Sequence, residues 1–201
     1  IDTELRYSVI QDKRNQSFRP TEGYRASFNQ KLPLYSESPS LINGIDYSAY
    51  HSFSDNLIGS LRFHGRAINS LSSSEDVKLS ERLSIPGKYL RGFEVGKIGP
   101  VDASDYIGGN YVTALGFNAA LPKLLPNLTN ADVSLFLDTG NVWGIDYDTN
   151  IDESNKLRSA FGVSVDWFTP IGPLSFSFSE AITSASTDRL ESFRFNIGTT
   201  F

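Results

Sequence analysis

Hydrophobic residues recur at every second position along most of this 201-residue chain. In the last segment, one face carries Phe193, Phe195, Ile197 and Phe201, and the other carries Ser192, Arg194 and Asn196. A β-strand separates two such sets because its successive side chains point to opposite faces, whereas helical spacing would mix them. The alternation therefore predicts an all-β chain built from strands with one apolar and one polar face.

The same pattern predicts about nine strands. Their approximate ranges are 3–11, 23–33, 42–54, 56–67, 108–121, 131–143, 157–169, 173–182 and 190–201. Most are longer than the roughly 5–6 residues of an average soluble strand and long enough for the roughly 9–11 residues of a tilted membrane strand. Their polar face is rich in Ser, Asn, Arg, Gly and Asp. We therefore expect an antiparallel transmembrane β-barrel with lipid outside and a wet lumen, since a sheet in lipid must pair all its backbone groups.

The connections between these strands alternate in length. The shorter ones are 54–56, 122–130 and 169–173, and the longer ones are 34–41, 68–107, 144–156 and 183–189. Membrane barrels have short periplasmic turns and long external loops, so this alternation favours a barrel. The polar runs within 146–155 and 183–189 are expected to be solvated.

Composition excludes several classes of function. The chain has no cysteine and two histidines, which rules out disulfides and zinc–thiolate centres and leaves little for a histidine metal site. The net charge of −5 disfavours a nucleic-acid-binding protein. The sequence therefore predicts no cofactor, no metal and no nucleic-acid partner. The first residues do not match a signal peptide, which is expected of a mature or truncated product.

The longest connection, 68–107, is expected to have a function, because loops of that length without secondary structure usually do. If it folds into the lumen, Arg91 can meet the polar wall, which offers Asp138 and Asp166. An arginine can bind a carboxylate through two parallel hydrogen bonds. Gly92 would permit a positive φ or a close approach to the wall, and Phe93 would pack on it. A solvated loop arginine is the alternative.

Several short segments are more specific. They are YLRGFE at 89–94, IGGN at 107–110, LFLDTGNVW at 135–143, PIGP at 170–173, the turn DKRN…PTEG within 12–23, and the aromatic terminus. In this order and spacing they resemble the BamA-type family of outer-membrane assembly and translocation proteins, over essentially the whole chain.

That resemblance implies a sixteen-stranded barrel in the bacterial outer membrane, with residues 1–201 as its last nine strands and without the periplasmic POTRA domains. It implies a non-enzymatic factor that inserts and folds outer-membrane proteins. The implied partners are outer-membrane lipids, client outer-membrane proteins and accessory assembly lipoproteins.

The resemblance also assigns roles to residues. It implies that Arg91 pairs with Asp138 and holds the loop inside the barrel, whereas Asn118 stands where the family usually has a second carboxylate. It also implies that the C-terminal strand forms one side of a lateral seam and carries a recognition signal. The signal residues are Phe193, Phe195, Ile197 and Phe201.

Three alternatives remain open at this point. A related barrel of the same superfamily would secrete or translocate a polypeptide instead of inserting barrels. A soluble lipid-binding barrel would carry its apolar side chains inside. The run Phe136-Leu137-Asp138-Thr139-Gly140 is similar to an aspartic-protease strand, but that chemistry needs a second carboxylate and hence a dimer.

Overall fold

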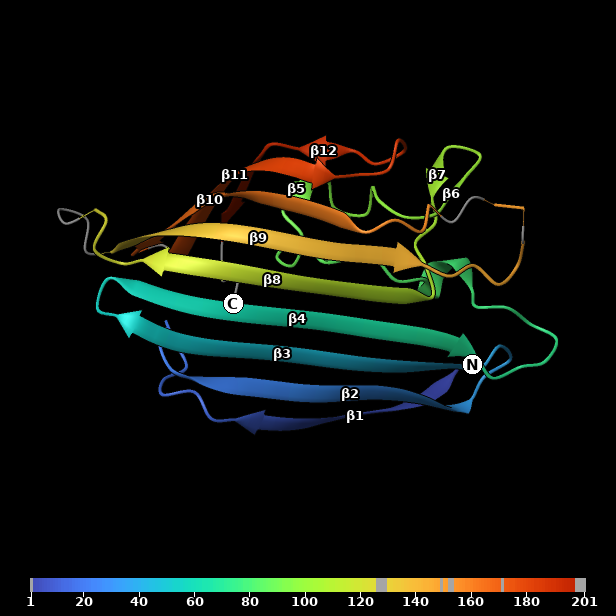
Figure 1. Ribbon diagram of the computed structural model, residues 1–201. Helices are drawn as coiled ribbons and strands as arrows, with labels where there is room; N and C mark the ends of the chain where they lie inside the picture. Colours follow the sequence, from blue (N-terminus) through green and yellow to red (C-terminus); the bar gives the residue numbers. More distant parts are fainter. Residues whose placement is uncertain (1, 126–129, 149, 152–153, 171, 198–201) are drawn as a thin grey trace.

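Nine antiparallel strands form one continuous sheet in the computed structural model, which describes residues 2–125, 130–148, 150–151, 154–170 and 172–197 (Figure 1). The strands of the sheet, in order, are β1 (Thr3–Asp12), β2 (Gly23–Tyr35), β3 (Ser40–Ser54), β4 (Leu57–Ser70), β8 (Tyr111–Leu121), β9 (Ala131–Trp143), β10 (Arg158–Thr169), β11 (Gly172–Thr183) and β13 (Phe193–Ile197). Each strand pairs with the next along the chain, so β1 and β13 are the edges within the described residues. The predicted all-β antiparallel architecture is confirmed.

Side-chain alternation separates an apolar outer face from a polar inner face. On β9, Leu135 is 52% exposed and Leu137 43%, while Asp138 is 0% exposed. On β13, Phe193 and Phe195 are exposed and Arg194 between them is buried. An outward apolar face is what a membrane barrel presents to lipid. The soluble lipid-binding barrel, which needs its apolar side chains inside, is therefore wrong for this chain.

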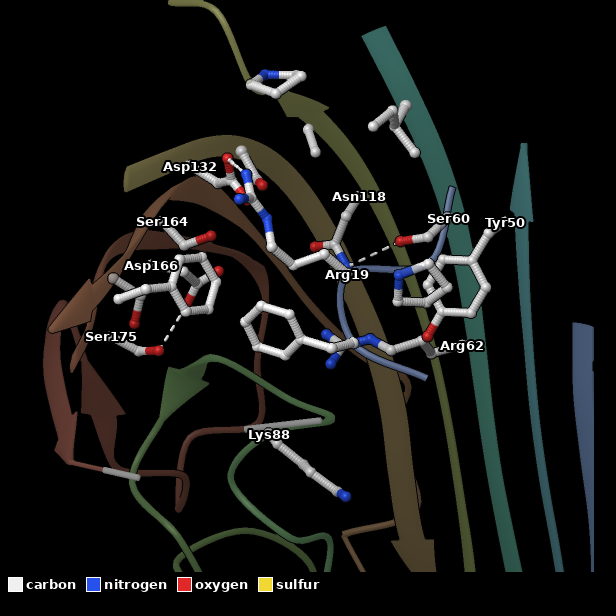
Figure 2. Close-up of a pocket in the computed structure, with 18 of the residues that line it drawn as sticks. Arg19, Tyr50, Ser60, Arg62, Lys88, Asn118, Asp132, Ser164, Asp166 and Ser175 are labelled. Atoms are coloured by element: carbon white, nitrogen blue, oxygen red, sulfur yellow. Dashed lines mark hydrogen bonds and ion pairs between the residues drawn. The ribbon is translucent and has the colours of Figure 1, made fainter. Parts of the chain in front are cut away.

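The concave side of the sheet encloses the lumen. Beyond β9 the sheet curves so that β10 and β11 turn back over this side (Figure 1). A lumen cavity of about 820 Å³ lies there, lined mainly by polar side chains such as Ser60, Arg62, Asn118 and Ser175 (Figure 2). The turn between β1 and β2 reaches this cavity, where Arg19 forms an ion pair with Asp132 at the start of β9.

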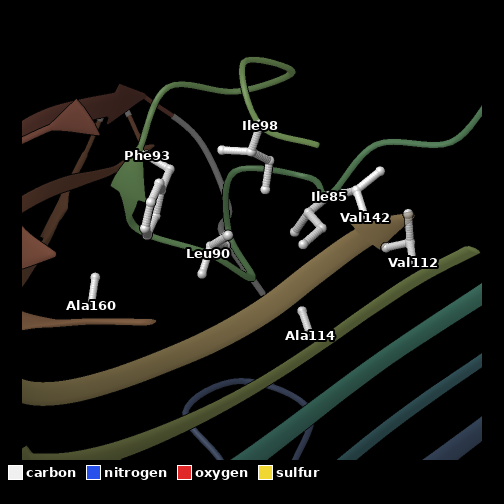
Figure 3. Packing of buried hydrophobic residues seen from close by; sticks show 8 residues of the cluster. All are labelled: Ile85, Leu90, Phe93, Ile98, Val112, Ala114, Val142 and Ala160. Carbon is white, nitrogen blue, oxygen red and sulfur yellow. The ribbon is translucent and has the colours of Figure 1, made fainter. Parts of the chain in front are cut away.

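The segment between β4 and β8, residues 71–110, folds into the lumen and is called the lumen loop here. It contains a 3-10 helix, η1 (Leu79–Glu81), and the short strands β5 (Gly92–Phe93), β6 (Val101–Asp102) and β7 (Asp105–Tyr106). Four of its apolar side chains pack on four from the wall: Ile85, Leu90, Phe93 and Ile98 on Val112, Ala114, Val142 and Ala160 (Figure 3). The loop thus has a small hydrophobic core inside an otherwise polar lumen, which corrects the expectation of a loop without secondary structure. No helix in the ranges given above is long and apolar enough to span a membrane.

Eight of the nine predicted strands lie within three residues of the observed bounds, and the ninth is divided. The strand expected at 108–121 begins at Tyr111, because Gly108 has a φ of +69° and a Cβ on Gly109 would lie 2.4 Å from the carbonyl oxygen of Trp143. The strand expected at 190–201 is two elements. Its first part, β12 (Leu190–Glu191), pairs with β5 of the lumen loop, and β13 joins the main sheet. Phe201 lies outside the described residues.

Candidate functional site

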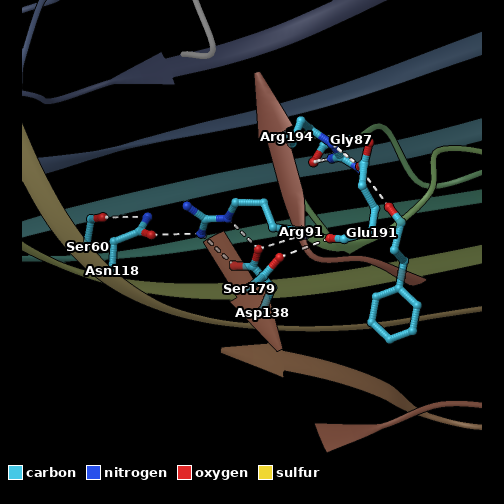
Figure 4. Close-up of polar contacts among 9 residues, drawn as sticks. Ser60, Gly87, Arg91, Asn118, Asp138, Ser179, Glu191 and Arg194 are labelled. Carbon is cyan, nitrogen blue, oxygen red and sulfur yellow. Dashed lines mark hydrogen bonds and ion pairs between the residues drawn. The ribbon is translucent and has the colours of Figure 1, made fainter. Parts of the chain in front are cut away.

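Arg91 of the lumen loop faces Asp138 on the barrel wall (Figure 4). Its Nε donates to Asp138 Oδ2 at 2.6 Å and its Nη2 to Oδ1 at 2.7 Å, while its backbone N–H donates to Oδ2 at 3.0 Å. The guanidinium carbon lies 3.6 Å from the ring centroid of Phe136. A two-pronged pair of this kind is among the strongest polar contacts in proteins, and here it ties the loop to β9.

Asn118 on β8 provides a further contact for Arg91. Its Oδ1 accepts from Arg91 Nη2 at 2.8 Å, and its Nδ2 donates to Ser60 Oγ at 3.4 Å. Gly116, two residues earlier on the same face, leaves the space that Asp138 occupies, since a Cβ there would lie 2.9 Å from Asp138 Oδ1. Because the side chain of Asn118 is a neutral amide, Asp138 is the single carboxylate that this part of the wall offers to Arg91.

Asp166, the other proposed wall partner of Arg91, lies elsewhere in the lumen. It pairs across strands with Asp132, and its Oδ1 accepts a hydrogen bond from Ser175. Asp132 precedes Asp138 by six residues on β9, which separates the two levels by about 20 Å at roughly 3.3 Å per residue. The structure therefore brings Arg91, Asp138 and Asn118 together and leaves Asp166 apart.

Arg194 on β13 holds the lumen loop from a second side. Its Nη1 donates to the carbonyl of Gly87 at 2.7 Å, its Nη2 to the carbonyl of Phe93 at 2.5 Å, and its Nε to Glu191 at 2.6 Å. Arg194 is not among the site residues predicted from the sequence. The sequence signal that could have identified Arg194 is its position on the polar face of a strand whose opposite face is aromatic.

Tyr89 joins the lumen loop to β3 and β4. Its hydroxyl donates to Asp46 Oδ1 at 3.2 Å, and its ring stacks on His64 with the centroids 4.4 Å apart. Burial and the neighbouring Asp46 charge raise the pKa of Tyr89 to about 12, so it remains a neutral donor at physiological pH. Asp46 also accepts from Arg66 at 2.6 Å, which balances its charge.

Two ion pairs lie in loops that were expected to be solvated, and they correct that expectation. Arg158 and Asp188 pair at 2.9 Å with both side chains 0% exposed. Arg82 of the lumen loop pairs with Asp146. Burial raises the pKa of Asp146, but hydrogen bonds from the Val77 amide, Asn110 and Arg82 outweigh it and lower the pKa below its ordinary value. Hydrophilic loops here carry buried polar contacts that their composition does not reveal.

Gly92 and Phe93 lie against the wall beside Arg91. Gly92 has a φ of +90°, and a Cβ on it would lie 2.6 Å from the Cβ of Ala160. Phe93, 1% exposed, fills the core of the lumen loop, and both residues pair with β12. The glycine is required both for its backbone conformation and for its lack of a side chain.

Gly92→Ala is expected to destabilise the docked loop by about 1–2 kcal/mol for the left-handed backbone, with an added cost for displacing Ala160. Trypsin cleavage within 71–110 of the folded protein measures this, because Lys78, Arg82, Lys88 and Lys97 all lie there. Gly96→Ala is the matched control, since Gly96 also has a positive φ, +71°, but has no atom within 4 Å of an added Cβ. Equal cleavage of the two variants would show that the contact with Ala160 does not matter.

Asp138 does not have the surroundings of an aspartic-protease carboxylate. That chemistry needs two carboxylates sharing a proton, and both oxygens of Asp138 accept hydrogen bonds from Arg91. Within the described ranges, no three His, Asp or Glu side chains are grouped to hold a metal ion. The geometry thus favours a structural clamp between loop and wall.

An antiparallel sheet with an apolar outer face, a polar lumen and a long loop bound inside defines a barrel of the outer-membrane type. The Omp85 superfamily domain matches residues 1–201, so the chain belongs to the Omp85 superfamily. The resemblance to BamA-type proteins is confirmed, and the location is the bacterial outer membrane.

The chain is similar to two outer membrane protein assembly factors named BamA. That of Neisseria meningitidis serogroup B is 30% identical over 141 residues, which are 56% of this chain and 17% of that protein. That of Neorickettsia risticii is 25% identical over 207 residues, which cover 100% of this chain and 28% of that protein. The chain thus spans less than a third of the length of either relative.

A solved structure has the same fold. The crystal structure of BamA from Haemophilus ducreyi lacking POTRA domains 1–3 matches with a TM-score of 0.84 and 25% identity, covering 96% of this chain and 41% of that one. The strand order and the inserted loop described above therefore belong to a known barrel architecture.

Proposed function

We propose that this chain forms the C-terminal part of the barrel of an outer-membrane assembly factor, one that inserts and folds other outer-membrane proteins. The observation that carries the proposal is the lumen loop, held inside an Omp85-type wall by Arg91 and Asp138. On this proposal the chain supplies nine strands of a sixteen-stranded barrel. The remaining strands and the periplasmic POTRA domains belong to other parts of the protein.

The edge at β13 supports a role as one side of a lateral seam. Five residues of β13 pair with β11, whereas eleven residues of β10 do so. An edge strand presents unpaired backbone N–H and C=O groups, and an incoming strand can satisfy them by adding to the sheet. Phe193, Phe195 and Ile197 give this edge an apolar outer face that suits lipid. Phe201 is proposed to complete the recognition signal that the C-terminal strand carries.

The proposed activity involves no covalent chemistry and no cofactor. The wall would open at the seam, a client strand would pair with β13, and the docked lumen loop would keep the lumen braced. The proposed partners are outer-membrane lipids, client outer-membrane proteins and accessory assembly lipoproteins. The related alternative, a polypeptide-translocating barrel, would use the lumen instead of the seam.

A photo-crosslinking experiment on the full-length protein in cells separates these two functions. Phe195→p-benzoylphenylalanine places the probe on the outer face of the edge strand, and Leu137→p-benzoylphenylalanine places it on the outer face in mid-wall. We expect client barrel proteins to crosslink at position 195 and not at 137. Crosslinks to a passing polypeptide from Ser164→p-benzoylphenylalanine on the inner face, with none at 195, would instead support translocation.

A further inference from the structure

Arg62 on β4 differs from the other arginines that line the lumen cavity. Arg19 pairs with Asp132 and Arg91 with Asp138. Across the described part of the chain, no carboxylate lies within ion-pair distance of Arg62, and its Nε is buried without a hydrogen-bond partner. Leaving a buried donor of a charged group without a partner is unfavourable, so an anion that accepts from the Arg62 Nε would be favoured here.

The surroundings of Arg62 are positively charged. Arg91 lies near enough for the two guanidinium groups to repel each other, and Lys88 of the lumen loop lines the same cavity (Figure 2). Asp138 is the carboxylate beside them, and Arg91 engages both its oxygens. Around Arg62, the three cations and Asp138 leave a local charge of 3 − 1 = +2, whereas the cavity carboxylates Asp132 and Asp166 lie at another level of the lumen.

The neighbouring groups do not cancel this charge. Asp46 is already paired with Arg66 and with His64. Asn118, at the position next to Ser60 across the strands, is neutral. Burial and the positive charge of Arg62 together lower the pKa of Lys88, as expected where cations gather without enough carboxylates.

The cavity offers room and further donors for an anion. Its volume of about 820 Å³ exceeds that of a single small oxyanion, and the hydroxyls of Tyr50 and Ser60 line it next to Arg62. A guanidinium fork matches the paired oxygens of a carboxylate or phosphate, and an ammonium adds a mobile point charge. We propose that Arg62 and Lys88, with Arg91 behind them, form a site in the lumen that binds a carboxylate or phosphate group.

The test uses the full-length protein in an uncharged detergent at low salt, titrated calorimetrically with inorganic phosphate. A second arm uses the peptide acetyl-Gly-Asp-Gly-amide, with its Asn counterpart as control. We expect saturable binding of phosphate and of the Asp peptide at one shared site. Tighter binding of the peptide would assign the site to polypeptide carboxylates, and tighter binding of phosphate would assign it to phosphate groups.

Three variants locate the site. Arg62→Gln should weaken binding by about tenfold or more, the loss expected for one charge-assisted contact. Arg189→Gln removes the same charge from an exposed position outside the cavity lining, and should change affinity by less than about threefold. Asn118→Asp adds a carboxylate beside the cluster and should weaken binding as strongly as Arg62→Gln.

Unchanged gel migration of the unboiled protein shows that each variant folds. Two results would overturn the proposal: no saturable binding by the wild-type protein, or equal weakening by Arg62→Gln and Arg189→Gln. The second result would mean that overall charge, and not the cavity, attracts the anion.

Discussion

Replacing Arg91 by alanine is expected to release the lumen loop from the wall. The change would leave the carboxylate of Asp138, which is 0% exposed, without its guanidinium partner. Removing one member of a buried ion pair typically costs about 3–5 kcal/mol. We expect rapid trypsin cleavage at Lys88, next to the released contact, while the barrel still migrates as a folded species when unboiled. If the proposed function is right, the variant should also fail to support growth as the sole full-length copy.

Two control variants separate the contribution of the Arg91–Asp138 ion pair to loop docking from the contributions of the two residues taken singly. Arg91→Lys keeps the charge but loses the two-pronged geometry, so partial protection is expected. Asp138→Asn combined with Arg91→Ala removes both charges, and its cost should be clearly smaller than the sum of the single costs. Unchanged protease resistance in Arg91→Ala would contradict the clamp.

The sequence was sufficient to predict which side chains share a face of the sheet. It was not sufficient to predict how far along the barrel each of them lies in the lumen. Alternation is local, so it separates the buried Asp138 from its exposed neighbour Leu137. Asp138 and Asp166 both lie on the inner face of the sheet, so alternation cannot show that they lie at different levels of the lumen. Their levels are set by strand register, which pairs Asp138 with Ala160 and Asp166 with Asp132.

The contacts of the loops could not be predicted because they join distant parts of the chain. Asp146 pairs with Arg82, 64 residues away, and its own neighbourhood reads only as a polar run. Likewise Leu190 lies just before the alternating residues of the last strand, yet it pairs with Phe93 of the lumen loop instead of with the wall. The length of the loop predicted only that Arg91 can meet the polar wall, and its pairing with Asp138 was implied by the resemblance to a family.

Arg158→Ala is expected to be the second strongly destabilising change. The Arg158 guanidinium donates to Asp188 at 3.0 and 2.9 Å, to Asn141 and the Lys156 carbonyl at 2.7 Å each, and to Ser154 at 2.9 Å. The side chains of Arg158 and Asp188 are both 0% exposed, so the variant buries an unpaired carboxylate at a cost of about 3–5 kcal/mol. A lower temperature for loss of the fast-migrating unboiled form measures this cost.

Arg189→Ala is the matched control, because Arg189 is an exposed arginine adjacent to Asp188 and its loss should change stability by less than about 0.5 kcal/mol. If Arg189→Ala lowers the transition as much as Arg158→Ala, net charge and not the buried pair determines the stability of this end of the barrel.

Replacing Arg91 and replacing Arg158 should also release different parts of the lumen loop. The loop that contains Asp188 is bonded to the lumen loop through the backbone of Arg189, which accepts from Glu94 at 2.9 Å and donates to Lys97 at 3.1 Å. Arg158→Ala should therefore expose Lys97 to trypsin before Lys88, whereas Arg91→Ala should expose Lys88 first. Identical cleavage patterns would mean that the lumen loop undocks as one unit, and that its two attachments act together.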